Sequence, residues 1–294
     1  MSQISLTAEN TLPDGGLTGC FVGRAWLPGD WGGPTPVLVS DEGVFDLLSV
    51  APTLSGLLAM DDPAAAALGG KGVRLGDVEA MLANSAHNNQ DPDQSYFLAP
   101  ADLQALKACG VTFVSSMLER VIEEQAKGDP DKAAEIRDAI GAEIGQSLAD
   151  ITPGSEEAAR VKAVLEEQGL WSQYLEVGIG PDAEVFTKSQ PMAAVGMGAE
   201  IGIHPKSTWN NPEPEIVLAI APDSRVVGAC LGNDVNLRDF EGRSALLLGK
   251  AKDNRASCAV GPFIRLFDDG FNLDHVRAMD ISLSVSGTDG FELQ

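Results

Sequence analysis

The chain has few cysteines, and none of them is arranged as a metal or disulfide motif. Its 294 residues include only four, Cys20, Cys109, Cys230 and Cys258, without a Cys-x-x-Cys pair. This spacing excludes a zinc ribbon, and the density is too low for a disulfide-rich secreted scaffold. A Gly-x-Gly-x-x-Gly loop is also absent, so the sequence gives no support for nicotinamide or flavin chemistry.

Positive charge is scarce as well. The chain carries 43 acidic and 20 basic residues, for a formal net charge of −23. That balance argues against nucleic acid and anionic membrane surfaces as partners, and an anionic substrate would need a local positive centre. There is no apolar run of about 18 residues to span a bilayer, and no basic segment leads into an apolar core near the first residues. We therefore expect a cytoplasmic protein.

Strand and helix patterns alternate along the chain and predict an α+β fold. In the first part we expect a strand over 21–27, a hairpin of 37–39 and 44–48, and short helices near Thr53 and over 78–84. Helices are predicted to dominate next, with one starting at Pro100, others over 111–127 and 131–149, and one opened by Ser155 and closed by Gly169. We expect domains at 1–98, 99–180 and 181–294.

The end of the sequence reads as an interrupted hairpin. Residues 279–286 alternate as a strand does, and 287–290 have the composition of a turn. The chain stops four residues later, in what should be the partner strand. Because unpaired backbone groups at such a strand would go unsatisfied, the sequence predicts that the natural protein is longer.

The most informative stretch is a second predicted hairpin, over residues 212–234. Two apolar runs flank the polar segment Pro222-Asp223-Ser224-Arg225, which is typical of a hairpin turn. A symmetric turn places Asp234 opposite Glu213 and Gly232 opposite Glu215. Since strand side chains alternate with period two, the three carboxylates would share one face.

Three converging carboxylates need a counter-charge, because each raises the pKa of the others. A hard divalent cation with oxygen ligands is the natural choice, and Mg²⁺ is the first candidate. The alternative is that Glu213 and Glu215 are solvated strand residues. Lys252 lies in a glycine-containing segment and is either a surface lysine or a group that faces the metal. The three histidines, His87, His204 and His275, have no partner at ligand spacing.

The motifs in this region resemble the fumarylacetoacetate hydrolase superfamily. The matching segments are Pro-Glu-Pro-Glu-Ile-Val-Leu-Ala (212–219), Gly-Asn-Asp-Val-Asn-Leu-Arg-Asp (232–239) and Ala-Lys-Asp-Asn-Arg-Ala-Ser-Cys-Ala-Val-Gly-Pro-Phe-Ile (251–264). The resemblance covers about residues 185–290 well. It implies a mixed β-roll catalytic domain with a smaller N-terminal α+β domain and a helical lid, and an enzyme that acts on 2-oxo acids with Mg²⁺, or with Mn²⁺ or Ca²⁺. The family's C-terminal strands have no counterpart here.

The resemblance also implies roles for individual residues. Glu213, Glu215 and Asp234 match the family's metal ligands, and Lys252 matches its active-site lysine. Glu119 aligns with the lid position at which the family's hydrolases carry a water-activating histidine. Further residues are expected to contact the substrate: Lys188, Ser116 and Ser257. The alternatives are that Lys188 is a surface lysine and that Glu119 is a solvated helix residue.

With glutamate in place of that histidine, elimination is favoured over hydrolysis. The resemblance is strongest to dehydratases of 2-keto-3-deoxypentonates, lyases of pentose catabolism that form 2,5-dioxopentanoate. In the reaction it implies, Mg²⁺ polarises the 2-oxo group, a base removes a C3 proton and the 4-hydroxyl leaves, with Glu119 and Lys252 in the proton-transfer roles. The alternatives are a C–C hydrolase of acylpyruvates, with His87 or another group as the water base, and a non-catalytic oxo-acid-binding protein. A homodimer or homotetramer is expected, with a small-molecule substrate.

Overall fold

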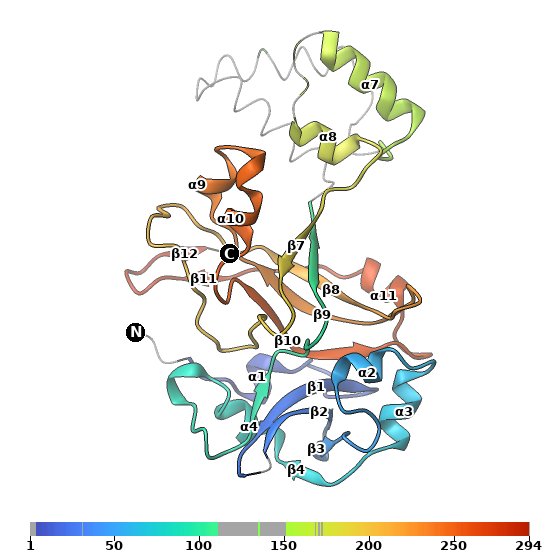
Figure 1. Cartoon of the computed structure of the whole chain (residues 1–294), viewed down its shortest axis with the longest axis vertical. Helices are drawn as coiled ribbons and strands as arrows, with labels where there is room; N and C mark the ends of the chain where they lie inside the picture. Colours follow the sequence, from blue (N-terminus) through green and yellow to red (C-terminus); the bar gives the residue numbers. More distant parts are fainter. Residues whose placement is uncertain are drawn as a thin grey trace. The chain divides into compact units, whose positions relative to one another are not determined.

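The computed structural model describes residues 4–30, 32–110, 135, 151–167, 169, 171 and 173–293. The chain divides into two compact units (Figure 1). The first combines Met1–Leu106 with Thr187–Gln294, and the second is Lys107–Phe186. Among the described helices, none has the length and apolar character needed to cross a bilayer.

An eight-stranded sheet forms the centre of the first unit. Its order is β4-β3-β2-β1-β10-β9-β8, with β5 also paired to β1. All pairings between these strands are antiparallel. The strand bounds are β1 Phe21–Leu27, β2 Gly33–Ser40, β3 Gly43–Asp46, β4 Arg74–Gly76, β5 Tyr96–Leu98, β8 Pro214–Ile220, β9 Val226–Asp234 and β10 Cys258–Leu266. Because β1 pairs with β10, the N-terminal and C-terminal parts of the sequence share one sheet.

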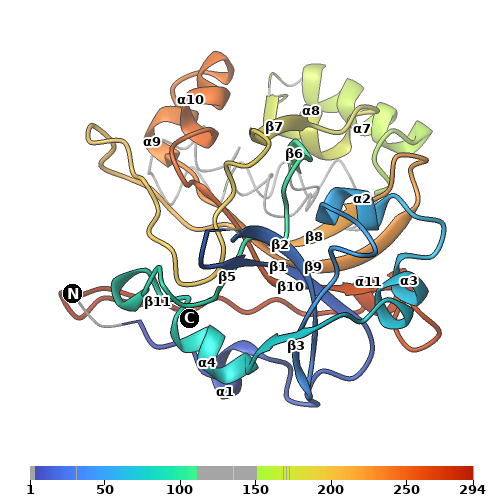
Figure 2. The same cartoon turned by 60° about the horizontal axis from the view of Figure 1, so that its bottom comes forward.

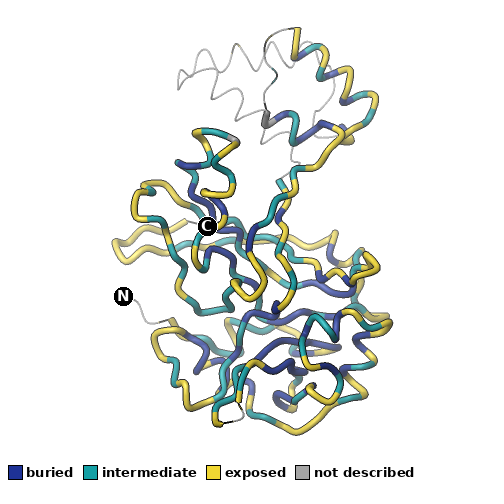
Figure 3. Tube along the Cα trace, in the orientation of Figure 1, coloured by how far each residue is buried: buried dark blue, intermediate teal, exposed yellow. Residues whose placement is uncertain are grey.

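Both faces of the sheet are covered by packed side chains. Because strand side chains alternate with period two, neighbouring residues of one strand pack into different cores. Val22, Leu38 and Ile264 point into one core with the leucines of α2. Val37 and Phe263, on the opposite face of the same strands, pack with residues of α4. Figure 2 shows α2 and α3 on one side of the first strands and α4 on the other, and the burial along these strands is visible in Figure 3.

The short helices of this part of the chain begin at side-chain caps. Thr53 accepts from the N–H of Gly56 at the start of α2, and Asp77 accepts from the N–H of Glu79 at the start of α4. Such caps satisfy the first free N–H groups of a helix. The bounds are α1 Ala8–Thr11, α2 Leu54–Leu58, α3 Pro63–Gly69, α4 Val78–Ala83 and η1 His87–Asn89. The predicted strand 21–27, the first hairpin and the helices near Thr53 and over 78–84 are all confirmed.

The helix predicted to start at Pro100 is wrong. The backbone there bends and then forms the strand β6, Leu106–Cys109, which pairs with β7, Val185–Ser189. The reason lies in Asp102, whose carboxylate accepts from the backbone N–H groups of Leu54 and Ser55. It therefore caps α2, a different helix.

In the second unit the described helices are α7, Glu156–Glu167, and α8, Gln173–Ile179. Ser155 accepts from the N–H of Ala158, and Gly169 has a φ of 70° beyond the C-terminal end of α7. Both helix boundaries were predicted. The helices expected over 111–127 and 131–149 lie outside the described residues, apart from helical Glu135.

The C-terminal segments carry shorter elements than the sequence predicts. Residues 279–284 are not a strand, because the apolar side chains of Met279 and Ile281 stay 47% and 44% exposed and have no core to pack against. The two-residue strands β11 and β12 pair around the predicted turn at 287–290. The bounds are α9 Arg238–Glu241, η3 Ala245–Leu247, α10 Leu248–Lys252, α11 Leu273–Arg277, β11 Val285–Ser286 and β12 Glu292–Leu293.

Candidate metal centre

The β8–β9 hairpin has the register that the sequence predicts. Glu215 pairs with Gly232, and Pro214 with Asn233. One step further, the N–H of Asp234 donates to the carbonyl of Glu213 at 2.9 Å. The register shifts only near the turn, between Ala219 and Ile220. The prediction that Asp234 lies across from Glu213 is therefore confirmed.

This register brings the three carboxylates together. Glu213, Glu215 and Asp234 each offer an oxygen within 4.8 Å of the other two. Asp234 is buried, and the two glutamates are half-buried. Carboxylate oxygens are the donors that Mg²⁺ and Ca²⁺ prefer, whereas a softer metal would call for sulfur or imidazole. The donor set therefore fits a hard divalent cation, and we call these residues the acidic triad.

Lys252 reaches the acidic triad from the last residue of α10. Its ammonium contacts Oε2 of Glu213 and lies 2.9 Å from Oδ2 of Asp234. The helix is held in place by a small core in which Ala251 packs with Leu237 and Phe240 of the α9 region. Sequence reasoning named Lys252, and the structure brings it to the triad.

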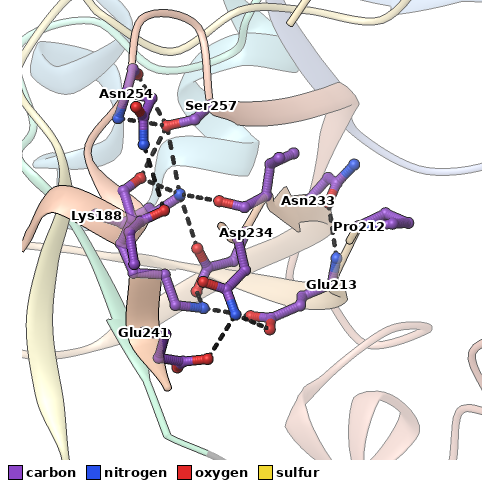
Figure 4. Close-up of polar contacts among 12 residues, drawn as sticks. Lys188, Pro212, Glu213, Asn233, Asp234, Glu241, Asn254 and Ser257 are labelled. Carbon is purple, nitrogen blue, oxygen red and sulfur yellow. Dashed lines mark hydrogen bonds and ion pairs between the residues drawn. The ribbon is translucent and has the colours of Figure 1, made fainter. Parts of the chain in front are cut away.

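Lys188 is the second ammonium at this site, and it is buried, with 2% of its surface exposed. From β7 its Nζ lies 2.9 Å from Oδ1 of Asp234. It also donates to the carbonyl of Val235 at 2.8 Å and to the carbonyl of Lys252. Figure 4 shows Lys188 beside Asp234, with dashed lines from its nitrogen to several neighbouring protein groups. Its third hydrogen bond goes to the hydroxyl of Ser257 at 3.4 Å, so the three protons of the ammonium have three protein acceptors, and the contact with Asp234 Oδ1 is an ion pair.

Two residues that sequence reasoning did not single out support the triad. The fully buried amide of Asn236 donates from Nδ2 to Glu213 Oε1 at 3.1 Å and to Glu241 Oε2 at 2.7 Å. Arg238 donates to the same Glu241 oxygen at 2.8 Å. Asn236 lies in the 232–239 motif, two residues after Asp234, and this position could have identified it as a residue of the site. Glu241, on the helix that follows, had no such signal.

The electrostatics of the site follow from burial and from these neighbours. Burial, and then the charges of Asp234 and Glu213, raise the pKa of Glu215 to about 7. For Lys252 burial acts in the opposite direction, but the attraction of Glu213 and Asp234 outweighs it and raises the pKa of the ammonium. The three carboxylates therefore repel one another, and the charges of Lys252 and Lys188 reduce that repulsion.

A similar balance holds Glu241 ionised. Burial disfavours its charge, but the hydrogen bond from Asn236 and the charges of Lys252 and Arg238 together lower the pKa of its carboxyl. Glu241 is thus a fourth carboxylate that feels the charge of Lys252. It is not part of the acidic triad.

The remaining predicted site residues fall in three places. Ser257 is buried, and its hydroxyl contacts the carbonyls of Lys252 and Asn254. His87 is exposed, with Nε2 3.5 Å from Glu200. Glu119 and Ser116 lie outside the described residues.

In chemical terms the arrangement can hold a divalent cation and keep a protonated amine beside it. A metal at carboxylate oxygens can act as a Lewis acid on a substrate carbonyl. An ammonium at its edge can bind an anionic substrate group or take part in proton transfer. The site is therefore suited to binding an anionic substrate that also carries a carbonyl group.

Comparison with known proteins points in the same direction. No protein-family model matches the chain. A probable 2-keto-3-deoxyxylonate dehydratase of Haloferax volcanii is 35% identical over 120 residues, which is 41% of this chain and 40% of that protein. A 2-dehydro-3-deoxy-D-arabinonate dehydratase of Saccharolobus solfataricus is 31% identical over 102 residues, 35% of this chain and 33% of that protein. The matched segments thus span less than half of these relatives.

The fold is also shared with solved structures. A 2-keto-3-deoxy-D-arabinonate dehydratase complexed with magnesium and 2,5-dioxopentanoate superposes with a TM-score of 0.52 at 18% identity, over 83% of this chain and 65% of that one. A hexagonal crystal form of 2-keto-3-deoxyarabinonate dehydratase gives 0.53, also at 18% identity, over 84% and 67%. The α+β class expected from the sequence is confirmed. The resemblance to dehydratases of the fumarylacetoacetate hydrolase superfamily that the motifs indicate is confirmed: the chain is similar to 2-keto-3-deoxy-arabinonate and -xylonate dehydratases, in sequence over part of its length and in fold.

Proposed function

We propose that the protein catalyses the metal-dependent dehydration of a 2-keto-3-deoxypentonate to 2,5-dioxopentanoate. The proposal rests on the acidic triad together with the Lys252 ammonium, which contacts Glu213 and Asp234. This constellation occurs in a chain whose sequence relatives are named as dehydratases of this substrate class. Further parts of the proposal are the β-roll with a helical lid, a homodimer or homotetramer, and Mg²⁺ as the metal.

In this proposal the acidic triad would hold the cation. When bound, the metal would supply Lewis-acid polarisation of the substrate's 2-oxo group. The chain's own groups would move the protons: one takes a proton from C3, and another protonates the 4-hydroxyl, which leaves as water. The resulting enone would then tautomerise to 2,5-dioxopentanoate: C5 and its hydroxyl each give up a proton, and C3 and C4 each take one. We assign these two roles to Lys252 and to Glu119, which lies outside the described residues, without assigning which is acid and which is base. Ser116 and Ser257 are proposed to border the substrate.

The test is incubation of the protein with 2-keto-3-deoxypentonate and Mg²⁺, followed by detection of the semialdehyde product. Formation of 2,5-dioxopentanoate, with loss of one water by mass spectrometry, is the expected result. Cleavage of an acylpyruvate without turnover of the pentonate would overturn it in favour of C–C hydrolysis. Metal-dependent binding without turnover of either substrate would instead indicate an oxo-acid-binding protein.

A single substitution tests the proton-transfer assignment. Glu119→Gln keeps the size of the side chain and removes its ability to exchange a proton. It should abolish turnover and leave the affinity for Mg²⁺ unchanged, as measured by calorimetry. An unchanged rate would remove Glu119 from the mechanism.

A further inference from the structure

The two ammonium groups at the acidic triad differ in how they are anchored. Nζ of Lys188 is tied to the backbone carbonyls of Val235 and Lys252 as well as to Asp234 Oδ1. Backbone carbonyls within a packed structure cannot turn away. Nζ of Lys252 contacts side-chain oxygens, Glu213 Oε2 and Asp234 Oδ2. Lys188 is therefore a fixed part of the site, whereas Lys252 sits between two carboxylates that can also serve another cation.

Those two carboxylates belong to the acidic triad. A hard divalent cation needs their oxygen lone pairs, and its charge repels an ammonium at the same position. Asp234 Oδ1 remains with Lys188 in either state. Hence Lys252 and a metal would compete electrostatically for Oδ2 of Asp234 and Oε2 of Glu213.

A displaced Lys252 ammonium would not be left without a counter-charge. Asn236 bridges Glu213 to Glu241 through one amide nitrogen, at 3.1 Å and 2.7 Å. This places the Glu241 carboxylate next to Glu213, and Glu241 already interacts electrostatically with Lys252. Figure 4 shows Glu241 and Glu213 in the same cluster of polar contacts. A movement of the ammonium from the triad toward Glu241 would therefore keep the lysine beside a carboxylate.

We propose that Lys252 is the resident counter-ion of the metal-free site, and that it competes with a divalent cation for Glu213 and Asp234. Metal binding moves the Lys252 ammonium out from between these carboxylates, while Lys188 keeps its contact with Asp234. The competition is independent of the substrate. Only the use of the released ammonium in catalysis rests on the proposed function.

We expect loss of Lys252 to raise the affinity for Mg²⁺. Replacing a lysine that contacts the ligands should strengthen metal binding, because the cation no longer has to displace it. Mg²⁺ is titrated by calorimetry into the metal-stripped full chain of the wild type, of Lys252→Met and of Lys250→Met. Lys250 is an exposed lysine of the same helix and serves as the matched control.

The affinity of Lys252→Met should rise by at least about tenfold, as expected from removing one adjacent positive charge at an effective dielectric constant of about 20. Lys250→Met should bind as the wild type does. Unchanged or weaker Mg²⁺ binding by a folded Lys252→Met variant would overturn the proposal. The proposal would also be overturned if none of the three proteins bound Mg²⁺.

A second measurement uses the wild type, so it does not depend on the variant's folding. In protein labelled with ¹⁵N-lysine, the ammonium signals of Lys188 and Lys252 are both expected to be protected from solvent exchange, and Mg²⁺ should remove the protection of Lys252 while Lys188 keeps its own. An unaltered Lys252 signal under saturating Mg²⁺ would contradict the displacement. Failure of the dehydratase assay with both results intact would count against the proposed function alone.

Discussion

Gly232 lies opposite Glu215 in the β8–β9 hairpin, and the space beside it is filled by Val217. A Cβ added at Gly232 would stand 2.5 Å from Cγ2 of Val217. Val217 follows Glu215 on the same face of its strand. The strand that carries two of the triad's carboxylates is therefore packed closely against this glycine.

The first prediction follows from that contact. Gly232→Ala should lower the free energy of unfolding by about 1–3 kcal/mol, because the methyl group overpacks the hairpin. Urea denaturation measures the change. Gly69→Ala, in a helix position with nothing within 4 Å of the added Cβ, should be neutral or stabilising by up to about 1 kcal/mol. Equal effects of the two substitutions would contradict the packing described for Gly232.

Glu215 should affect metal affinity and metal-free stability in opposite directions. Glu215→Gln removes a carboxylate proposed to bind the metal directly. Loss of a residue that only hydrogen-bonds to a metal ligand lowers metal affinity by up to about 100-fold, so the affinity for Mg²⁺ should fall by more than that. The same change removes a carboxylate that is buried beside Asp234 and Glu213, so the metal-free protein should unfold at an equal or higher temperature.

The control for Glu215 lies in the same hairpin. Asp223 is exposed in the turn, where it pairs with Arg225 at 2.6 Å. Asp223→Asn should leave the affinity for Mg²⁺ unchanged. Retention of wild-type affinity by Glu215→Gln would remove Glu215 from the metal site.

A pH-dependent contribution to stability is expected from Asp102. Burial disfavours its charge, but hydrogen bonds from Ser55, Leu103 and Leu54 outweigh burial and lower the pKa of the carboxyl. The group's charge also faces the buried Arg24, 3.8 Å away. Because the folded pKa lies below the unfolded one, this stabilisation is complete above about pH 4. It is lost as the pH falls through the folded value.

Asp102→Asn should therefore cost about 3 kcal/mol near neutral pH, because it leaves Arg24 buried without its counter-charge. The difference from the wild type should shrink as the pH falls below 4, where the wild-type carboxyl also becomes neutral. Denaturant unfolding at several pH values measures it. Asp62→Asn at the exposed cap of α3 should be nearly neutral, since asparagine caps as well as aspartate. If the loss of unfolding free energy caused by Asp102→Asn grew as the pH fell, the lowered pKa assigned to Asp102 would be wrong.

Reactivity of the four thiols should be unequal. Burial raises the pKa of Cys20 and of Cys258 to about 11 and of Cys230 to about 12, which suppresses the reactive thiolate. Cys109 is exposed. Native protein should therefore show one fast thiol with a disulfide reagent at pH 8, and Cys109→Ser should remove it. Fast reaction of several thiols in the folded protein would contradict the burial described for the other three.

The hairpin that bears the acidic triad could be predicted from sequence because local rules determine it. The turn residues, two apolar runs and period-two alternation placed Asp234 opposite Glu213 and Gly232 opposite Glu215, and the structure has that register. The starts of the capped helices were predictable for the same reason, because the side chains of Thr53 and Ser155 accept hydrogen bonds from N–H groups three residues later in the chain.

Features that depend on contacts distant in sequence were not predictable. Asp102 looked like the start of its own helix, yet its carboxylate caps α2, more than forty residues earlier in the chain. The contacts of Lys188 with Asp234 and with two backbone carbonyls could not be predicted, and its expected contact with the substrate stays a prediction. Nothing in the pattern around Glu241 indicated that Asn236 would connect it to Glu213.

The most direct test of the account is the rate of 2,5-dioxopentanoate formation from 2-keto-3-deoxypentonate as Mg²⁺ is added to metal-stripped protein. The account predicts no product without metal, and a rate that rises with the fraction of sites filled in the calorimetric titration. It also predicts no turnover by Glu215→Gln at Mg²⁺ concentrations that saturate the wild type. The same rate in the presence of a chelator, or no product when the metal site is full, would contradict it.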